Sequence, residues 1–422
     1  MLHWINRFNI CSFLDNHQYP SSHQTIECLA AAGAHKIFSA TETIFPQFSS
    51  FLANQHDWLF GHFNYDLKNE IEPLFSNHPD HIGFPDIFFF QPEIVLELDQ
   101  DRLCIASLTL DPALIFEEIK GLRIPIPNEL TTVQLIPRIE KADYLQIIKQ
   151  LQEHIRRGDC YEINFCQEFY AEKVCIDPLL VYTALTALSP NPFSCFYKQN
   201  HRYLLCASPE RYLQKKNNRI LSQPIKGTYP RNLTDTETDH ALKTYLSNSE
   251  KDKSENVMVV DLVRNDLSRI CREGSVKVDE LFGIYTFPQV HQMISTISGE
   301  LKEGIDLTRI IQASFPMGSM TGAPKRSVME LIEKFEKTKR GIYSGAVGYI
   351  RPDGDFDFNV VIRSILYNEQ NQYLCCLVGG GITFYSDPEQ EYAECLLKAA
   401  AIKKVLENPD RDSLFGSNGS FQ

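Results

Sequence analysis

Short strand-like runs occur along the chain, and in its larger C-terminal part they alternate with helical segments. The strand-like runs span residues 58–63, 87–98, 203–208, 345–350 and 373–378. The segments with helical character span residues 144–155, 254–271, 325–337 and 388–406. This pattern predicts an α+β fold, with mixed or antiparallel β-sheets packed against helices.

Two of the helical segments have recognisable ends. The first carries an apolar stripe that Gly158 terminates, formed by Tyr144, Ile147, Ile148, Leu151 and Ile155. The last begins with an N-cap, a proline in the first turn and a glutamine at N3, supplied by Asp387, Pro388 and Gln390.

A polar, proline-containing stretch at residues 125–132 interrupts the pattern. It predicts an N-terminal region at 1–125 and a larger domain at 133–406. Residues 408–422 are rich in Asp, Ser and Gly, which predicts a flexible tail.

Composition excludes several classes of protein. The formal net charge of −13 argues against a nucleic-acid partner, and it requires any site for an anion to be locally positive. The 12 cysteines include no CxxC pair, so we expect reduced thiols rather than a disulfide framework. Neither a signal peptide nor a membrane span is recognisable, so we expect a cytoplasmic protein without a membrane partner.

Two acidic pairs have helical spacing. Asp252 and Glu255 lie three residues apart, as do Glu391 and Glu394, so each pair shares one helix face. Two such faces brought together offer the oxygen ligands that Mg²⁺ prefers. The alternative is a pair of solvated acidic faces near helix N-termini.

Two further segments have the character of anion sites. Gly379, Gly380 and Gly381 follow an apolar run, and consecutive glycines let backbone N–H groups converge on an anion. The segment 322–325 sets a proline at N1 and Lys325 at a helix start. A flexible turn and an ordinary helix start are the alternatives.

Four single residues stand out. Arg363 lies inside an apolar, strand-like run, where its charge needs a partner such as a carboxylate from the protein or a ligand. Tyr343 is either a packed aromatic residue or a ligand contact. Lys226 and Glu210 have the sequence context of surface residues, and a nucleophilic lysine needs a lowered pKa.

Taken together, these segments resemble the chorismate-utilising enzyme family, which includes component I of anthranilate synthase and component I of aminodeoxychorismate synthase. The resemblance is strongest from about residue 138 to 405, in the order and spacing of segments 207–211, 224–228, 260–267, 315–325 and 343–349. Residues 61–67 and 85–86 look like the family's N-terminal segment. The resemblance implies a large two-subdomain chorismate-binding fold.

The resemblance also implies roles for the matching positions. Glu255 and Glu394 would bind Mg²⁺ directly, while Asp252 and Glu391 would hold metal-bound waters. Substrate contacts are implied for Arg363 and Tyr343 and for the glycine run. The remaining positions assigned to the substrate site are Thr228, Gln292, Ser319 and Lys325.

Lys226 distinguishes between branches of the family. Anthranilate synthases usually read Pro-Ile-Ala-Gly-Thr at this segment, whereas aminodeoxychorismate synthases read Pro-Ile-Lys-Gly-Thr, as this chain does. The resemblance then implies a covalent role for Lys226 and a general-acid role for Glu210. Glu162 departs from the Gln usual in aminating members, and Gln292 from a His associated with pyruvate elimination. Isochorismate and salicylate synthases have a lysine base for water at the position of Glu162, so a carboxylate there leaves water open as an alternative nucleophile.

Two rival interpretations are an anthranilate synthase component I and a non-catalytic subunit of the same fold. The lysine and the glutamine argue against the first, and the retained site residues against the second. The chain has no recognisable glutaminase signature, so we expect ammonia from a separate glutaminase subunit. Nothing after residue 405 is long enough for a fused lyase, so a further enzyme is expected to act on the product.

Overall fold

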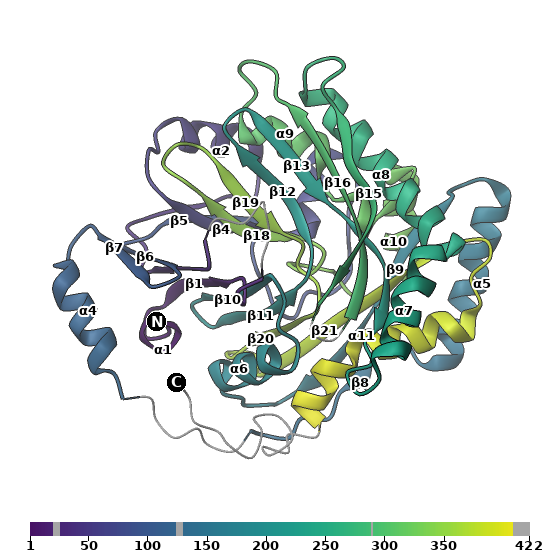
Figure 1. Cartoon of the computed structure of the whole chain (residues 1–422), viewed down its shortest axis with the longest axis horizontal. Coiled ribbons are helices and arrows are strands. Elements are labelled where there is room, and N and C mark those ends of the chain that lie inside the picture. Colours follow the sequence, from purple (N-terminus) through teal and green to yellow (C-terminus); the bar gives the residue numbers. More distant parts are fainter. Residues whose placement is uncertain (20–25, 124–129, 288–289, 408–422) are drawn as a thin grey trace.

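The computed structural model describes residues 1–19, 26–123, 130–287 and 290–407. Two large β-sheets form its centre and helices surround them (Figure 1). Every strand pair in these sheets is antiparallel within the described residues. The α+β class with antiparallel sheets packed against helices is therefore confirmed.

The larger sheet has eleven strands. Its strands are β1 (Ile10–Asp15), β2 (Cys28–Ala32), β6 (Ile94–Asp99), β7 (Arg102–Ser107), β8 (Ile136–Pro137), β9 (Glu162–Glu172), β10 (Phe193–Gln199), β11 (Arg202–Ser208), β17 (Gly322–Ala323), β20 (Ser364–Asn368) and β21 (Tyr373–Ile382). They follow the order β17-β9-β21-β20-β11-β10-β1-β2-β6-β7, with β8 paired to β9.

The second sheet has ten strands. Its strands are β3 (Lys36–Ser39), β4 (Leu59–Phe63), β5 (Ile87–Gln91), β12 (Arg211–Lys216), β13 (Arg219–Gln223), β14 (Ile225–Pro230), β15 (Lys277–Thr286), β16 (Val290–Glu300), β18 (Ala346–Ile350) and β19 (Phe356–Asn359). They follow the order β14-β16-β13-β12-β19-β18-β4-β5-β3, with β15 paired to β16.

The helices include those predicted from the sequence. They are α1 (Leu2–Ile5), α2 (Ile44–Ala53), α3 (Lys68–Ile71), α4 (Pro112–Gly121), α5 (Lys141–Arg157), α6 (Pro178–Leu188), α7 (Thr236–Asn248), α8 (Glu250–Ile270), α9 (Leu307–Ser314), α10 (Lys325–Phe335) and α11 (Pro388–Glu407), with short 3₁₀ turns at Tyr65–Leu67 and Gly318–Met320. Gly158 ends α5 in the left-handed conformation, and Asp387 accepts a hydrogen bond from the N–H of Gln390 at 2.9 Å.

Most of the larger sheet is buried on both faces, and the alternation of side chains along β11 divides them between two hydrophobic cores. In β11, Leu204 and Cys206 belong to the core shared with the second sheet. Tyr203, Leu205 and Ala207 face the other core, which includes residues of α6 and α11. This packing fixes β21 and α11 against each other, and both carry predicted site residues.

Strands from the predicted N-terminal region and the predicted larger domain lie in the same sheets. Strand β1 pairs with β10, and β4 pairs with β18. Most of the predicted connection at 125–132 and the predicted tail at 408–422 lie outside the described residues. The predicted N-terminal region and the predicted larger domain therefore both contribute strands to each sheet.

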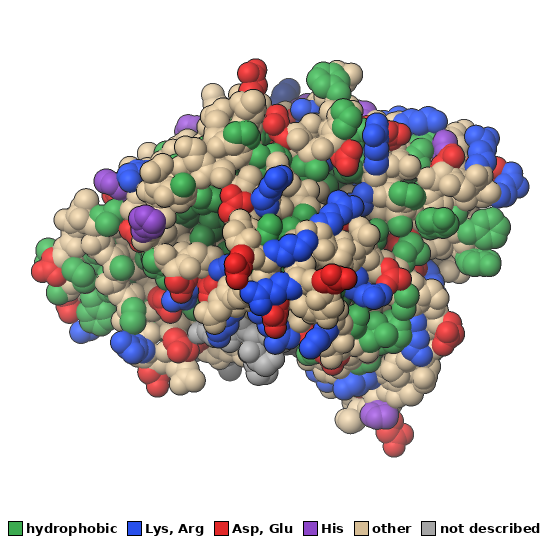
Figure 2. All heavy atoms as spheres, turned by 90° about the horizontal axis from the view of Figure 1, so that it is seen from above, with side chains coloured by type: hydrophobic (Ala, Val, Ile, Leu, Met, Phe, Trp, Pro, Cys, Tyr) green, Lys and Arg blue, Asp and Glu red, His purple; other side chains and the backbone are tan. Residues whose placement is uncertain are grey.

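The surface has mixed charge on the face shown in Figure 2, where basic and acidic side chains are interspersed. Among the helices of the described residues, none has the length and apolar character needed to cross a membrane. All 12 cysteines are present as free thiols.

Candidate active site

Several of the predicted site residues, among them Lys226, Glu255, Glu394 and Gly381, meet where β9 and β21 of the larger sheet approach β14, the edge strand of the second sheet. An atom pair joins the sheets directly, because Lys226 Nζ on β14 lies 2.5 Å from Glu162 Oε1 on β9. Helices α8 and α11 bring the acidic residues to the same place, since the charges of Glu255 and Glu394 act on Lys226 and on each other.

A bulge in β14 directs Lys226. The pairing with β16 shifts between Ile225 and Thr228, which inserts one extra residue on β14. Gly227 occupies the bulge with φ of +88°, and a Cβ there would lie 2.9 Å from Leu246 Cδ1 and 3.0 Å from Asp252 Cβ. The glycine of the segment 224–228 is thus required by the backbone that presents the lysine.

Lys226 is largely buried and paired, in contrast to the exposed lysine that its sequence context indicates. Its side chain is 11% exposed and that of Glu162 is 2% exposed. Burial lowers the pKa of Lys226, but the carboxylates of Glu162, Glu255 and Glu210 outweigh burial, so the net pKa is raised. The lysine is therefore held as an ammonium in this state.

Glu210 lies in the connection that leaves β11 of one sheet and enters β12 of the other. Ser208 organises this turn, because its hydroxyl donates to the Val360 carbonyl at 2.6 Å and accepts from the Glu210 N–H at 3.2 Å. Burial raises the pKa of Glu210 to about 7, against hydrogen bonds from Ser319 and the Ile225 N–H that lower it. A carboxyl group with this pKa can donate a proton near neutral pH.

The glycine run belongs to β21 and packs tightly against the site. A Cβ on Gly381 would lie 2.5 Å from Glu162 Oε1 and 2.8 Å from Lys226 Nζ. A Cβ on Gly380 would lie 3.3 Å from Glu391 Oε2, and one on Gly379 would lie 2.4 Å from Cys166 Sγ. Because these residues have no Cβ, β21 lies closer to the groups of the site than a strand with side chains at these positions could.

Two lysines lie among the acidic pairs of α8 and α11. Lys251 Nζ is 3.9 Å from Glu255 and 3.6 Å from Glu391, so it bridges the two helices. Lys398 Nζ is 2.8 Å from Glu394 and donates to the Gly379 carbonyl at 2.7 Å. The charge of Lys398 lowers the pKa of Glu394 against the opposing effect of burial.

The donor set is compatible with a hard divalent cation. Glu255 Oε1 is buried without a hydrogen-bond partner among the described residues, and burial raises the pKa of Glu255 to about 7. The other acidic groups also offer only oxygen ligands, and Mg²⁺ binds through one or two carboxylates with water and substrate oxygens. Within the described ranges, no group of three or more His, Cys, Asp or Glu residues forms a complete metal-binding set.

Arg363 does not lie inside a strand, contrary to the prediction. It occupies a bend just before β20 with φ of +53°, a conformation that costs energy for a residue with a side chain. Burial lowers the pKa of its guanidinium, while Tyr343 and Glu394 raise it. The phenol of Tyr343 is buried and thereby kept protonated, because burial raises its pKa.

Gln292 and His291 are neighbours on β16 and engage different partners. Gln292 pairs with Thr228 across the strands, and its Oε1 is buried without a hydrogen-bond partner in the described residues. His291 contacts Asp239 and Thr286, both at 3.1 Å. Successive side chains point to opposite faces of a strand, so Gln292 points away from the face of β16 on which His291 contacts Asp239 and Thr286.

Two predicted site residues of the segment 315–325, Ser319 and Lys325, have different surroundings. The Ser319 hydroxyl bonds to Glu210, within the site. Lys325 instead binds Asp266 at 2.6 Å and the Ser314 carbonyl at 2.9 Å. Pro324 is the N-cap of α10 and not its first helical residue, contrary to the prediction, so the helix begins at Lys325.

Lys251 and Lys398 are site residues that the sequence motifs do not single out. A usable signal was present, because each lies four residues from a predicted metal ligand on the same helix, at a spacing that favours ion pairs. The sequence marks Glu162 as a departure from a family pattern and as a candidate base for water, but not as the partner of Lys226. Its contact with Lys226 joins residues 64 positions apart and follows from the packing of two sheets.

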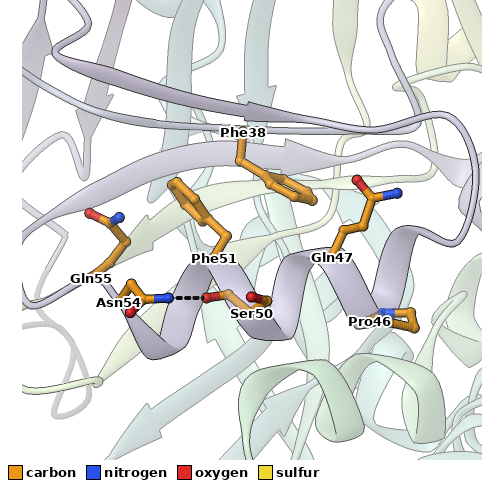
Figure 3. Close-up of a pocket in the computed structure, with 7 residues that line it drawn as sticks. All are labelled: Phe38, Pro46, Gln47, Ser50, Phe51, Asn54 and Gln55. Atoms are coloured by element: carbon orange, nitrogen blue, oxygen red, sulfur yellow. Dashed lines mark hydrogen bonds between the residues drawn. The ribbon is translucent and has the colours of Figure 1, made fainter.

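A separate surface hollow of about 540 Å³ lies between Phe38 of β3 and α2 (Figure 3). Its walls are aromatic, amide and hydroxyl groups, and Asn54 donates to the Ser50 carbonyl at 2.9 Å along its rim. The hollow has no charged side chain in its lining and is not part of the site around Lys226.

The chain is similar to known proteins over most of its length. It is 35% identical over 351 residues to aminodeoxychorismate synthase component 1 of Salmonella typhimurium, covering 82% of this chain and 76% of that protein. It is 33% identical over 349 residues to anthranilate synthase component 1 of Saccharolobus solfataricus, covering 82% and 80%. The crystal structure of anthranilate synthase component I from Streptococcus pneumoniae matches with a TM-score of 0.77 and 26% identity, covering 92% and 95% of the two chains.

A protein family also matches most of the chain. Residues 15–404 match the family described as chorismate binding enzyme, so the match spans both predicted regions and both sheets. It includes β14, β21, α8 and α11, which carry the site described above. The chain belongs to the family of chorismate-binding enzymes.

Proposed function

We propose that the chain is component I of an aminodeoxychorismate synthase, which converts chorismate and ammonia into 4-amino-4-deoxychorismate. The observation that carries the proposal is the bulge in β14, which directs Lys226 into a buried site beside Glu210. The relatives named aminodeoxychorismate synthase component 1 support the same branch. The product would serve the formation of 4-aminobenzoate for folate.

Substrate binding requires positive charge and hydrogen-bond donors, because chorismate is a dianion and the protein has a net charge of −13. The guanidinium of Arg363 and the phenol of Tyr343 supply donors for a carboxylate, as do N–H groups of Gly379, Gly380 and Gly381. Thr228, Gln292, Ser319 and Lys325 are the further contacts that we propose. Of these, Lys325 needs to exchange its bond to Asp266 to take part.

Mg²⁺ is the proposed cofactor. Glu255 and Glu394 would hold it, with Asp252 and Glu391 orienting the site from outside. When bound, the ion supplies charge that holds the ring carboxylate and helps to activate the ring. The orphaned oxygen of Glu255 supports this assignment.

Two displacements account for amination at C4 of the ring. The amine of Lys226 attacks C2 while the C4 hydroxyl leaves, and Glu210 donates the proton that makes this group leave as water. Ammonia then attacks C4 and expels the lysine. A pKa of about 7 for Glu210 suits a group that donates and regains a proton in each cycle.

Ammonia would reach the site from a separate glutaminase subunit. The designation component 1 of the relatives supports a second component for those proteins. We propose that the pair works in the cytoplasm.

Mass spectrometry of the products tests the proposal. The chain is incubated with chorismate, Mg²⁺ and an ammonium salt, and we expect 4-amino-4-deoxychorismate without pyruvate. Lys226→Ala is expected to lose at least about a thousandfold of this activity, because the covalent route is removed. Full amination by the variant would contradict the covalent role.

Anthranilate synthesis is the second candidate, because the relative from Saccharolobus solfataricus is also 33% identical. It predicts anthranilate and pyruvate as products in the same experiment. Lys226 and Gln292 argue against it, as does the engagement of His291 by Asp239 and Thr286.

A further inference from the structure

Within the described ranges Glu162 has one ionic partner, Lys226, and it has no part in the function proposed so far. Its Oε1 lies 2.5 Å from Lys226 Nζ, and the side chain is only 2% exposed. Its Oε2 is buried and has no hydrogen-bond partner among the described residues. The carboxylate therefore depends on the lysine ammonium for its stability in the interior.

This dependence has a chemical consequence for Lys226. The lysine must lose a proton before its nitrogen has a lone pair for attack. If the proton left for solvent, a buried and unpaired carboxylate would remain, which is unfavourable. Transfer along the existing hydrogen bond neutralises both groups in one step and leaves neither charge unpaired.

The other nearby carboxyl groups are engaged in different ways. Glu210 accepts hydrogen bonds from Ser319 and the Ile225 N–H, and burial raises its pKa to about 7, as a proton donor requires. Glu255 lies 3.9 Å from Lys251 of the same helix, α8, and Lys251 also pairs with Glu391 of α11. In the part of the chain that the structure describes, neither Glu210 nor Glu255 forms a hydrogen bond with Lys226 Nζ, whereas Glu162 lies at hydrogen-bond distance from it.

We propose that Glu162 is a further catalytic residue, which takes the proton of the Lys226 ammonium before attack and returns it when the lysine is expelled. This inference rests on the proposed covalent function of Lys226. Gly381 maintains the contact, because a side chain at that position would meet both Glu162 Oε1 and Lys226 Nζ.

Protons and charges balance over the cycle. The ammonium passes a proton to Glu162, the neutral amine forms a bond to C2, and the C4–O bond breaks as Glu210 donates a proton to the departing water. An incoming ammonium ion then gives a proton to Glu210 and attacks C4 as ammonia. The expelled lysine regains its proton from Glu162, so all three groups return to their starting states.

The test follows the covalent step alone. The chain is mixed with chorismate and Mg²⁺ without ammonia, quenched at short times between pH 6 and 9, and the lysine adduct is quantified by intact-protein mass. In Glu162→Gln, the side chain keeps its shape but cannot accept the proton. We expect adduct formation to be roughly 100-fold slower at pH 7 and to recover as pH rises and hydroxide replaces the missing base.

Two variants control for structural effects. Glu168→Gln removes another buried carboxylate from β9, which pairs with Arg138 and not with Lys226, and should leave the pH profile of adduct formation unchanged. Glu162→Asp keeps an acceptor and should restore part of the rate. It also serves as the second variant if the glutamine variant does not fold.

The outcomes separate this inference from the proposed function. If Glu162→Gln forms the adduct at or above the wild-type rate at pH 7, Glu162 only pairs with the lysine and the inference is wrong. If the wild-type chain aminates chorismate but never forms an adduct, the covalent function itself is wrong, and the role of Glu162 falls with it.

Discussion

The environment of each residue, more than its type, determines the chemistry of this site. Lys226 and Glu210 both have the sequence context of surface residues, yet the packing of the two sheets buries them together. Burial raises the pKa of Glu210 to about 7, while neighbouring carboxylates hold Lys226 as an ammonium despite its burial. Glu210 can therefore donate a proton near neutral pH, whereas Lys226 must lose a proton before it can attack.

The raised pKa of Glu210 predicts a pH-dependent stability difference. A carboxyl group with a raised pKa stabilises the folded state while it is protonated, and this contribution is lost as pH rises from about 4.5 to about 7. Relative to wild type, Glu210→Gln should therefore gain stability over this interval, by up to about 3 kcal/mol. Urea unfolding at pH 5 and pH 8 measures the change.

Removal of an exposed carboxylate is the control for this measurement. Glu303, whose side chain is 95% exposed, is changed to Gln and followed at the same two pH values. An equal pH effect in both variants would show that the buried position of Glu210 is not the cause.

At the scale of elements, the site depends on how strands and helices end or deviate. The bulge in β14 directs Lys226, the bend before β20 presents Arg363, and the turn between β11 and β12 carries Glu210 between the sheets. Ser249 caps α8, accepting from the N–H of Asp252 at 3.3 Å. The cap starts the helix four residues before the predicted boundary and so includes Asp252 in its first turn.

Lys251 pairs with acidic residues of both α8 and α11, so we expect it to compete with a metal ion for these carboxylates. Lys251 lies near both acidic pairs, so a divalent cation must displace its charge to bind there. Lys251→Gln should bind Mn²⁺ about two- to fivefold more tightly in the absence of chorismate, a modest gain because the ion pairs are partly exposed. Isothermal titration calorimetry measures the affinity directly.

Lys253→Gln is the matched control on the same helix. Lys253 pairs with Glu250 at 3.6 Å and not with the acidic pairs. Equal Mn²⁺ affinities for wild type and both variants would contradict the competition.

The whole molecule is organised by two sheets that each draw strands from distant parts of the chain. Strand β1 continues the larger sheet beyond β10, and β4 continues the second sheet beyond β18. Each sheet would present an unpaired edge and an uncovered apolar face if the first 125 residues were removed. The family match at 15–404 has the same extent as this joint architecture.

The shared sheets predict that the larger domain does not fold alone. A chain of residues 130–422 should lack a cooperative thermal transition by circular dichroism, whereas the full chain should show one. A chain of residues 1–407 keeps every strand of both sheets and is the control. A cooperative transition in the 130–422 fragment would indicate a separately folding domain and support the sequence-based boundary.

The sequence by itself determined the class of fold and most of the helices and strands. Periodic apolar residues and terminal signals such as Gly158 and Asp387 act locally, so they can be recognised without knowledge of the fold. The residue types of the site were also recognisable, because Lys226, Glu210 and the acidic pairs fall in segments with a family pattern. The conformation of Arg363 was not, since its left-handed bend follows an apolar run that favours a strand.

Only the tertiary structure decided which groups meet and in what protonation state. The pair of Lys226 and Glu162 joins two sheets, and Lys251 joins two helices, so neither contact is encoded by local spacing alone. Burial and opposing charge set the pKa of Glu210 and of Lys226, and both depend on the distances between side chains after folding. The sequence supplied a lysine in a turn-like segment, and the packing of two antiparallel sheets made it a buried ammonium beside a carboxylate.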